Sequence, residues 1–395
     1  MGPLKRALDM ARPAFSTILK TLKPDLVIYD FLQPWAPEKA AAQNIPAVVF
    51  LSTGAAASSL IMHDWFEPRS EYPFSQSIYF RENEYSIRSR LVKSTGTDTN
   101  DHIRVRDCVR KSNDVVLIKT FRELEGKYID FLSELTRKKI VPVGPLVQNN
   151  NNNNDNNNEK SDLIEWLDRK DRRSTIFASF GSEYFLSENE IEQIACGLEL
   201  SGVNFVWALR FPTGENINIH EKLPLGFLER VGERGMVVEG WAPQQRILSH
   251  LSVGGFLSHC GWSSVMEGLY WGVPIVAAPM NLDQPLNARL VEEVGVGEEV
   301  VRSREGEIDR GEVARVVRNV VAGEAVEVLR RVAEMSERMR EKGEEEIDGV
   351  VEELVRLCNK EERLMNKIES EGSMKRLNNV MMVVENRERV LSENT

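Results

Sequence analysis

Residues 254–268 read GGFLSHCGWSSVMEG, and this stretch decides the fold. An apolar run ends at His259, a short turn follows, and a helical pattern begins with Trp262. The pattern predicts a strand, a tight turn and a helix, and such a turn directs backbone N–H groups at an anion beyond the strand. The alternative is a helix that is simply well capped, with Ser264 and Glu267 forming a capping box.

The same alternation of strand and helix recurs along the chain. Short apolar runs predict strands at residues 25–31, 46–50, 115–121, 174–181, 204–210, 236–241, 254–259 and 274–280. Most of these runs are continuously apolar, as expected for parallel strands that are covered on both faces. Between them lie helical patterns such as residues 187–202, which begin with a Ser187/Glu190 capping box and end at Gly202. The alternation predicts a doubly wound α/β architecture.

A polar, asparagine-rich segment divides the chain. Residues 148–160 cannot bury a core, so they are expected to form a linker or loop. We expect one α/β domain over residues 1–147 and a second over residues 161–345. A closing helix at residues 346–360 and a poorly ordered tail at residues 361–395 are expected to follow. The first domain is expected to be short, because three predicted strands precede the linker and five follow it.

The composition excludes several classes of protein. The chain carries 50 basic and 61 acidic residues, a formal net charge of −11, without the basic stripe of a nucleic-acid-binding protein. No run approaches the roughly 18 apolar residues of a membrane span, and the first residues lack the apolar core of a signal peptide. Four separated cysteines form no CxxC pair. We therefore expect a cytoplasmic monomer without a metal site or disulfide framework.

Polar and aromatic residues follow the predicted strands, where ligands bind in open parallel sheets. They are Asp30, Ser182, Trp241, His259, Asp283 and Gln284. Each alone has an ordinary explanation as a helix cap, a satisfied histidine or a core aromatic residue. Together they favour a nucleotide site, because an indole can stack on a base, worth about 1–3 kcal/mol. A carboxylate such as Glu267 can accept hydrogen bonds from ribose, and a helix N-terminus can hold phosphate.

The absence of three common nucleotide-binding motifs from the sequence limits the classes of nucleotide that are expected to bind. No GxGxxG follows a predicted strand, so a dinucleotide is not expected, and no P-loop is present. No DxD-like acidic pair suggests a metal ion that would bind a diphosphate. The remaining class of ligand is a nucleotide sugar, bound without a metal or a separate cofactor.

Residues 241–284 resemble the signature block of plant UDP-dependent glycosyltransferases. The block begins with WAPQ, contains HCGW and GVP, and ends with DQ. The resemblance extends over residues 1–360 and implies an α/β fold of the GT-B type, in which two Rossmann-like domains face each other across a cleft. The sequences LVIYDFLQPWAP, FGSEYF and DQPLNARLVEE resemble the branch of the family that adds a sugar to an existing glycoside.

The resemblance implies roles for the nucleoside and phosphate side of the block. Trp241 would stack on uracil with Ala242 beside it, Gln244 would lie near the nucleoside, and Glu267 would bind ribose. The residues implied on the phosphate side are His259, Ser264, Ser182 and the turn at Gly261.

The resemblance also implies a sugar-binding side. Trp262, Asp283 and Gln284 would meet the donor sugar, and a terminal Gln in this block usually accompanies glucose. Ser263 departs from the pattern, because the family usually has Asn after HCGW. The shorter side chain keeps a hydroxyl group but loses a carboxamide donor, so weaker donor binding is expected.

A general base completes the family pattern. In the family, an N-terminal strand, loop and helix carry a histidine that deprotonates the acceptor, and an aspartate orients that histidine. Asp30 matches the aspartate, but no histidine stands near the start of this sequence. His63 could replace the missing base, although it is expected to line the acceptor cleft or the surface. The first domain is therefore expected to be incomplete.

Three functions remain open. The leading one is inverting transfer of a sugar, expected to be glucose, from a UDP-sugar to a hydroxyl group of a small plant metabolite that is already a glycoside. The second is a catalytically impaired fragment that binds UDP-sugar but lacks the general-base histidine. The third is another GT-B enzyme, such as a UDP-sugar epimerase, which the plant-type block disfavours. Product analysis separates the first from the third, and UDP binding without turnover would support the second.

Overall fold

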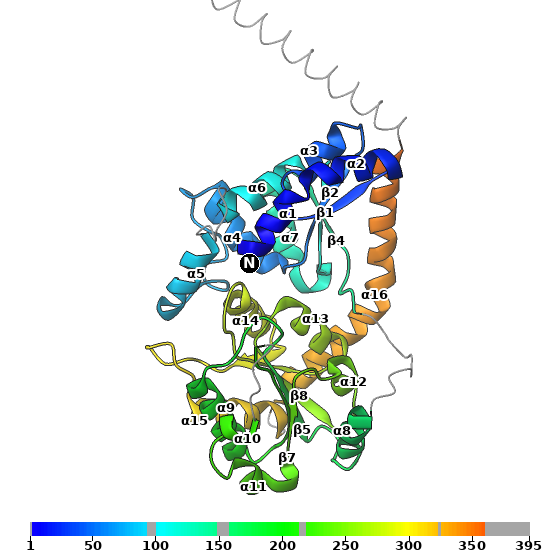
Figure 1. Cartoon of the computed structure of the whole chain (residues 1–395). Helices are drawn as coiled ribbons and strands as arrows, with labels where there is room; N and C mark the ends of the chain where they lie inside the picture. Colours follow the sequence, from blue (N-terminus) through cyan, green and yellow to red (C-terminus); the bar gives the residue numbers. More distant parts are fainter. Residues whose placement is uncertain (1, 93–99, 148–157, 213–218, 323–324, 360–395) are drawn as a thin grey trace, which may run out of the picture.

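A computed structural model describes residues 2–92, 100–147, 158–212, 219–322 and 325–359 (Figure 1). Most of the expected linker and the whole expected tail therefore lie outside the described residues. Within the described ranges, no helix combines the length and the apolar character that a membrane crossing requires.

The first sheet is entirely parallel, with the spatial order β1-β2-β3-β4. Its strands are β1 Val27–Asp30, β2 Ala47–Leu51, β3 Val115–Ile118 and β4 Lys139–Pro142. The helices around it are α1 Gly2–Met10, α2 Arg12–Leu22, α3 Ala36–Ala41, α4 Ala55–Phe66, the 3-10 helix η1 Glu82–Glu84, α5 Tyr85–Val92, α6 Asp101–Lys111 and α7 Arg122–Thr136. Both faces of the sheet are covered, because Val116 and Ile118 join one buried cluster and Val115 and Leu117 join another.

The second sheet is also parallel, with the order β10-β9-β8-β5-β6-β7. Its strands are β5 Thr175–Ser179, β6 Asn204–Leu209, β7 Gly235–Glu239, β8 Val253–Ser258, β9 Ile275–Ala277 and β10 Gly297–Glu299. The surrounding helices are α8 Asn158–Asp168, α9 Glu188–Ser201, α10 Ile219–Lys222, α11 Phe227–Val231, η2 Gly232–Arg234, α12 Gln244–Leu248, α13 Trp262–Tyr270, α14 Gln284–Glu293 and α15 Arg310–Val321. The expected pair of parallel α/β domains is confirmed.

Every predicted strand is present, but two further strands were missed. In the described part of the chain, β4 is the fourth strand of the first sheet, and β10 is the sixth strand of the second sheet. β10 reads GEE and contains no apolar run, and β4 contains Pro142. Each lies at the edge of its sheet and pairs with a single neighbour, so tertiary pairing rather than local pattern defines it.

The helix at residues 187–202 has the predicted ends. The Ser187 side chain accepts a hydrogen bond from the Glu190 backbone, and the Glu190 carboxylate accepts one from the Ser187 backbone. Gly202 ends the helix with φ 71°, the left-handed conformation that glycine adopts without strain. The capping box predicted here is confirmed.

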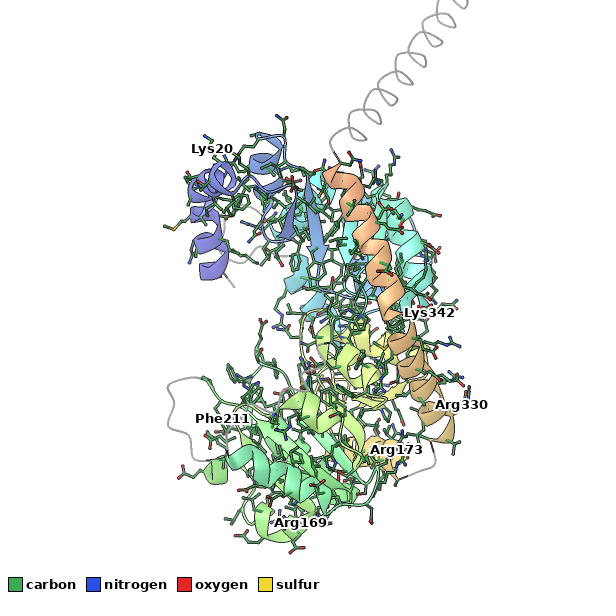
Figure 2. The ribbon with its side chains drawn as sticks, turned by 90° about the vertical axis from the view of Figure 1, so that its right-hand side faces the viewer. Lys20, Arg169, Arg173, Phe211, Arg330 and Lys342 are labelled. Atoms are coloured by element: carbon green, nitrogen blue, oxygen red, sulfur yellow. The ribbon has the colours of Figure 1, made fainter. Side chains whose placement is uncertain are left out.

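The closing helix is longer than expected. α16 runs from Val326 to Cys358 without a break, so the expected boundary between residues 345 and 346 lies inside it. The helix packs against α13 of the second domain and β4 of the first, so one apolar face is buried along both. Figure 2 shows it along one side of the molecule, with Arg330 in its lower half and Lys342 near its middle.

The carboxyl edges of the two sheets face each other. Lys119 directly follows β3, and α13 begins shortly after β8. The Trp262 indole donates a hydrogen bond to the Lys119 carbonyl, and the Lys119 ammonium donates one to the Ser263 hydroxyl at 2.9 Å. Residues that follow strands of both sheets therefore lie around the start of α13.

Candidate functional site

A cavity of about 1300 Å³ lies at the carboxyl edge of the second sheet. Loops that follow β5, β6 and β7 form its wall together with parts of α12 and α13. The predicted site residues on this wall are Ser182, Trp241, Ala242, Gln244, Ser263, Ser264 and Glu267. The volume is sufficient for a ligand of nucleotide-sugar size, since small-molecule pockets span roughly 300–1000 Å³.

Trp241 lies at the mouth of this cavity. Gly240 has φ 79°, a left-handed turn that takes the chain out of β7 and leaves the next side chain at the rim. The Trp241 side chain is 61% exposed. A planar ring placed on the indole would bury apolar area that otherwise faces water, which is the contact that base stacking provides.

Gln244 and Glu267 form a hydrogen-bonded pair on the cavity wall. The Gln244 amide donates to a Glu267 carboxylate oxygen at 2.9 Å and approaches the Ser264 hydroxyl at 3.5 Å. The pair joins the WAPQ segment to α13, although 23 residues separate the two side chains. Glu267 retains a second carboxylate oxygen that can accept a hydroxyl hydrogen bond.

The capping box suggested for Ser264 and Glu267 does not form. α13 begins at Trp262, its N-cap is Gly261, and no side chain caps it. Ser264 therefore lies in the first turn and Glu267 in the second, where neither can cap the helix end. The local pattern was misleading because the tight turn starts the helix three residues earlier than a Ser264 cap would.

His259 lies beneath the turn and is not part of the cavity wall. A Cβ atom added to Gly181 or Gly261 would approach its Nε2 atom to 2.6 and 2.5 Å, so both neighbours must be glycine. Burial lowers the pKa of His259 to about 4, which makes the ring neutral near pH 7. A hydrogen bond with the Ser179 backbone opposes this shift.

The side chain of Trp262 is not part of the cavity wall, and its contact with the donor sugar stays a prediction. The indole is 4% exposed and donates to the Lys119 carbonyl of the first domain. A Cβ atom added to Gly54 would lie 3.1 Å from the ring. The side chain therefore serves as an interdomain contact, and its backbone N–H in the first turn of α13 is the part that can face a ligand.

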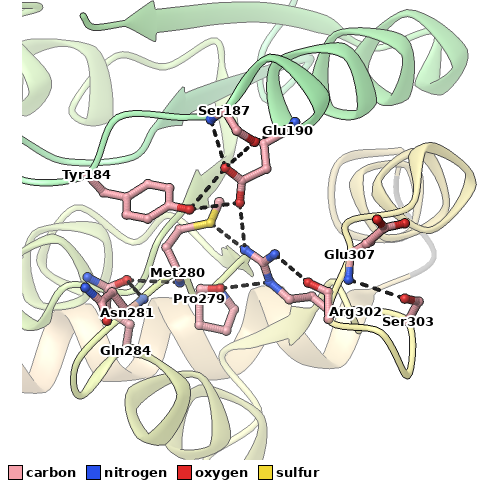
Figure 3. Close-up of polar contacts among 11 residues, drawn as sticks. Tyr184, Ser187, Glu190, Pro279, Met280, Asn281, Gln284, Arg302, Ser303 and Glu307 are labelled. Atoms are coloured by element: carbon pink, nitrogen blue, oxygen red, sulfur yellow. Dashed lines mark hydrogen bonds and ion pairs between the residues drawn. The ribbon is translucent and has the colours of Figure 1, made fainter. Parts of the chain in front are cut away.

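Asp283 and Gln284 start α14 beside the cavity rather than on its wall. The Gln284 carbonyl oxygen accepts hydrogen bonds from the backbones of Met280 at 3.0 Å and Asn281 at 2.8 Å (Figure 3). Asp283 accepts a hydrogen bond from Asn287 at 3.0 Å, and burial raises the pKa of its carboxyl group. These contacts hold the loop that precedes α14 in one shape.

Arg302 connects this loop with the segment that carries Ser182. Its guanidinium donates to the Pro279 carbonyl at 3.2 Å and pairs with Glu190 at 3.4 Å. Glu190 in turn accepts a hydrogen bond from the Tyr184 hydroxyl at 3.0 Å, two residues beyond Ser182 (Figure 3). A single buried network therefore orients both loops.

Asp30 ends β1 and makes a local contact. Its carboxylate accepts a hydrogen bond from the Leu32 backbone at 2.8 Å, and burial raises its pKa. Among the described histidine side chains, none hydrogen-bonds to Asp30. His63 is 4% exposed, bonds to Ser70 and packs against Tyr72, so it does not lie at the surface; a position along the acceptor cleft stays a prediction.

Two cationic residues near the site were missed. Arg210 lines the cavity directly after β6, and Lys119 contacts Ser263 directly after β3. Both residues were assigned to predicted strands, residues 204–210 and 115–121, that extend beyond the observed ends of β6 and β3. The apolar residues next to Arg210 and Lys119 made the predicted strands too long. A search that ended each strand at its first charged residue would have found them. In the described part of the chain, no group of His, Cys, Asp or Glu side chains is arranged to hold a metal ion.

Known proteins are similar to this chain in sequence and in fold. The family "UDP-glucoronosyl and UDP-glucosyl transferase" matches residues 146–333, which include every residue of the cavity wall. UDP-glucosyltransferase 29 from Panax ginseng is 51% identical, covering 91% of this chain and 79% of that protein. Cyanidin-3-O-glucoside 2-O-glucuronosyltransferase from Bellis perennis is 47% identical, covering 88% of this chain and 76% of that protein. The crystal structure of a UGT transferase from Siraitia grosvenorii in complex with UDP has a TM-score of 0.74 at 26% identity, covering 90% of this chain and 88% of that chain.

Proposed function

This chain belongs to the UDP-glucoronosyl and UDP-glucosyl transferase family, and we propose that it transfers glucose from UDP-glucose to a hydroxyl group of a small plant glycoside. The observation that carries the proposal is the cavity wall, where an exposed indole and a Gln–Glu pair lie beside the start of α13. The name of the ginseng relative supports a glucose donor, and the name of the Bellis relative supports a glycoside acceptor.

Each part of the wall has a role in this proposal. Trp241 stacks on uracil, and the free carboxylate oxygen of Glu267 accepts hydrogen bonds from ribose. The first-turn N–H groups of α13 and the Ser264 hydroxyl bind the diphosphate, aided by the helix dipole. Gln284 and Asp283 contact the sugar, with the Gln284 amide nitrogen as the donor, because its carbonyl oxygen is already bonded to the loop.

Transfer proceeds by direct displacement with inversion. The acceptor oxygen attacks the anomeric carbon while the bond from that carbon to the phosphate oxygen breaks, and UDP leaves. The acceptor proton must pass to a base, which typically contributes a factor of 10²–10⁴ to the rate. In the family pattern Asp30 orients the histidine that accepts this proton.

A second candidate function is UDP-sugar binding with little transfer. The observation that favours it is the environment of Asp30, whose described hydrogen bond is to the Leu32 backbone rather than to an imidazole.

One set of measurements tests both candidates. Calorimetry with UDP measures donor binding, and product analysis with UDP-glucose measures transfer to a flavonoid glucoside and to its aglycone. Binding with transfer to the glucoside supports the leading proposal, and binding without transfer supports the second candidate. Absence of UDP binding would contradict both.

A further inference from the structure

Lys119 is a half-buried cation that the described protein leaves without an anionic partner. Its Nζ atom donates to the Ser263 hydroxyl at 2.9 Å, and no described carboxylate forms an ion pair with it. Burial lowers its pKa, and attraction from Glu267 only opposes this effect. Removing an ammonium group from water is unfavourable unless a counter-charge compensates it.

The position of Lys119 indicates what the counter-charge could be. The residue comes from the carboxyl edge of the first sheet, yet its ammonium lies one hydrogen bond from Ser263 on the cavity wall. Ser263 occupies the first turn of α13, where N–H groups without helical partners already favour an anion. Glu267, the carboxylate that attracts the Lys119 ammonium, is bonded to Gln244.

We propose that Lys119 is a donor-binding residue supplied by the first domain, and that its ammonium group contacts the diphosphate of the nucleotide sugar at the start of α13. The inference rests on the proposed function, because it assumes that a nucleoside diphosphate occupies the cavity. The same contact stabilises the negative charge that develops on UDP as the glycosidic bond breaks. The Lys119 ammonium also supplies a hydrogen-bond donor in place of the asparagine carboxamide that the family usually has at the position of Ser263.

The competing explanation is structural, in which Lys119 only joins the two domains through Ser263. The two explanations predict different changes in ligand binding when the positive charge of Lys119 is removed. Lys119→Gln keeps an N–H donor for Ser263 but has no charge, whereas Lys119→Arg keeps the charge. Uridine fills the base and ribose positions without a diphosphate, so it reports structural damage alone.

The experiment measures binding of UDP and uridine to the whole chain by calorimetry. We expect Lys119→Gln to weaken UDP binding by about 10-fold or more, the usual value of a charge-assisted hydrogen bond. Uridine binding should change by less than about twofold, and Lys119→Arg should retain most of the UDP affinity. The matched control is Lys127→Met, because Lys127 pairs with Glu293 of the second domain away from the cavity wall.

Two results would overturn the inference. Unchanged UDP binding in Lys119→Gln would show that the ammonium does not contact the diphosphate. An equal loss for UDP and uridine would assign Lys119 to the domain contact. If the unsubstituted chain binds no UDP, the proposed function itself fails, and this outcome is distinct because it requires no variant.

Discussion

At the scale of single residues, Trp241 is an exposed aromatic side chain on the cavity wall. We expect Trp241→Ala to weaken UDP binding by about 1–3 kcal/mol, the usual range for base stacking. Thermal stability should change little, because the indole is mostly exposed. Titration calorimetry measures the first quantity and thermal unfolding the second. Leu251→Ala is a control, since Leu251 is another exposed apolar side chain on the cavity wall.

His259 predicts a specific dependence of stability on pH. Its folded pKa of about 4 lies below the usual histidine pKa of 6.5, so the unfolded chain binds the proton more readily. Its contribution to stability is therefore complete above pH 6.5 and is lost as the pH falls towards 4. The loss within this window reaches about 1.4 kcal/mol per pH unit.

We expect His259→Gln to reduce this acid sensitivity, whatever its effect at neutral pH. The measurement is the free energy of unfolding in denaturant at pH 7 and pH 5 for both proteins. The difference between the two pH values should be smaller in the variant. An identical difference would mean that His259 is not held neutral in the folded protein.

At the scale of elements, the Arg302 network couples the loop before α14 to the segment that carries Ser182. We expect Arg302→Met to lower the free energy of unfolding by roughly 1–3 kcal/mol, because Glu190 loses a partly buried partner. The relative rates with UDP-glucose and UDP-galactose should also change, since Gln284 is hydrogen-bonded to the loop that Arg302 holds.

A matched variant separates these effects from a general loss of an ion pair. Arg310→Met removes a contact with Glu192, also on α9, but the Arg310 guanidinium lies on neither loop. It should leave donor preference unchanged. UDP binding should stay similar in both variants, because Asp283 and Gln284 lie outside the cavity wall. A large loss of UDP binding in Arg302→Met would contradict the separation of sugar and nucleotide contacts.

At the scale of the whole molecule, a buried ionic network fastens the first domain to the second. Arg289 of α14 is 2% exposed and pairs with Glu84 of η1 at 2.9 Å and with Glu299 of β10. Arg81, which precedes η1, also pairs with Glu299. The network joins a segment of the first domain to the edge strand of the second sheet.

We expect Arg289→Met to lower the free energy of unfolding by about 3–5 kcal/mol, because the buried Glu84 carboxylate loses its arginine partner and Glu299 keeps only Arg81. Arg230→Met is the comparison, since the Arg230–Glu199 pair is more exposed and its loss should lower the free energy of unfolding much less. Denaturant unfolding at pH 7 measures both. An equal decrease in the free energy of unfolding for both variants would show that burial does not strengthen the contact that the Arg289 network makes between the domains.

By itself, the sequence determined the features that depend on neighbouring residues. The central strands of both sheets, the capping box of α9 and the signature block were all predicted correctly, because apolar periodicity and cap chemistry are local. The signature block also singled out Trp241, Gln244 and Glu267, which lie together on the cavity wall.

Only the tertiary structure decided the features that join distant parts of the chain. β10 exists because β9 offers it backbone partners, although its own residues are polar. Trp262 turned out to contact the first domain rather than the cavity. Lys119 and Ser263 are 144 residues apart in the sequence, and no local sequence pattern predicts the hydrogen bond between them. Burial and pairing of such residues are set by how the two domains pack, which is why these contacts became visible only in the folded chain.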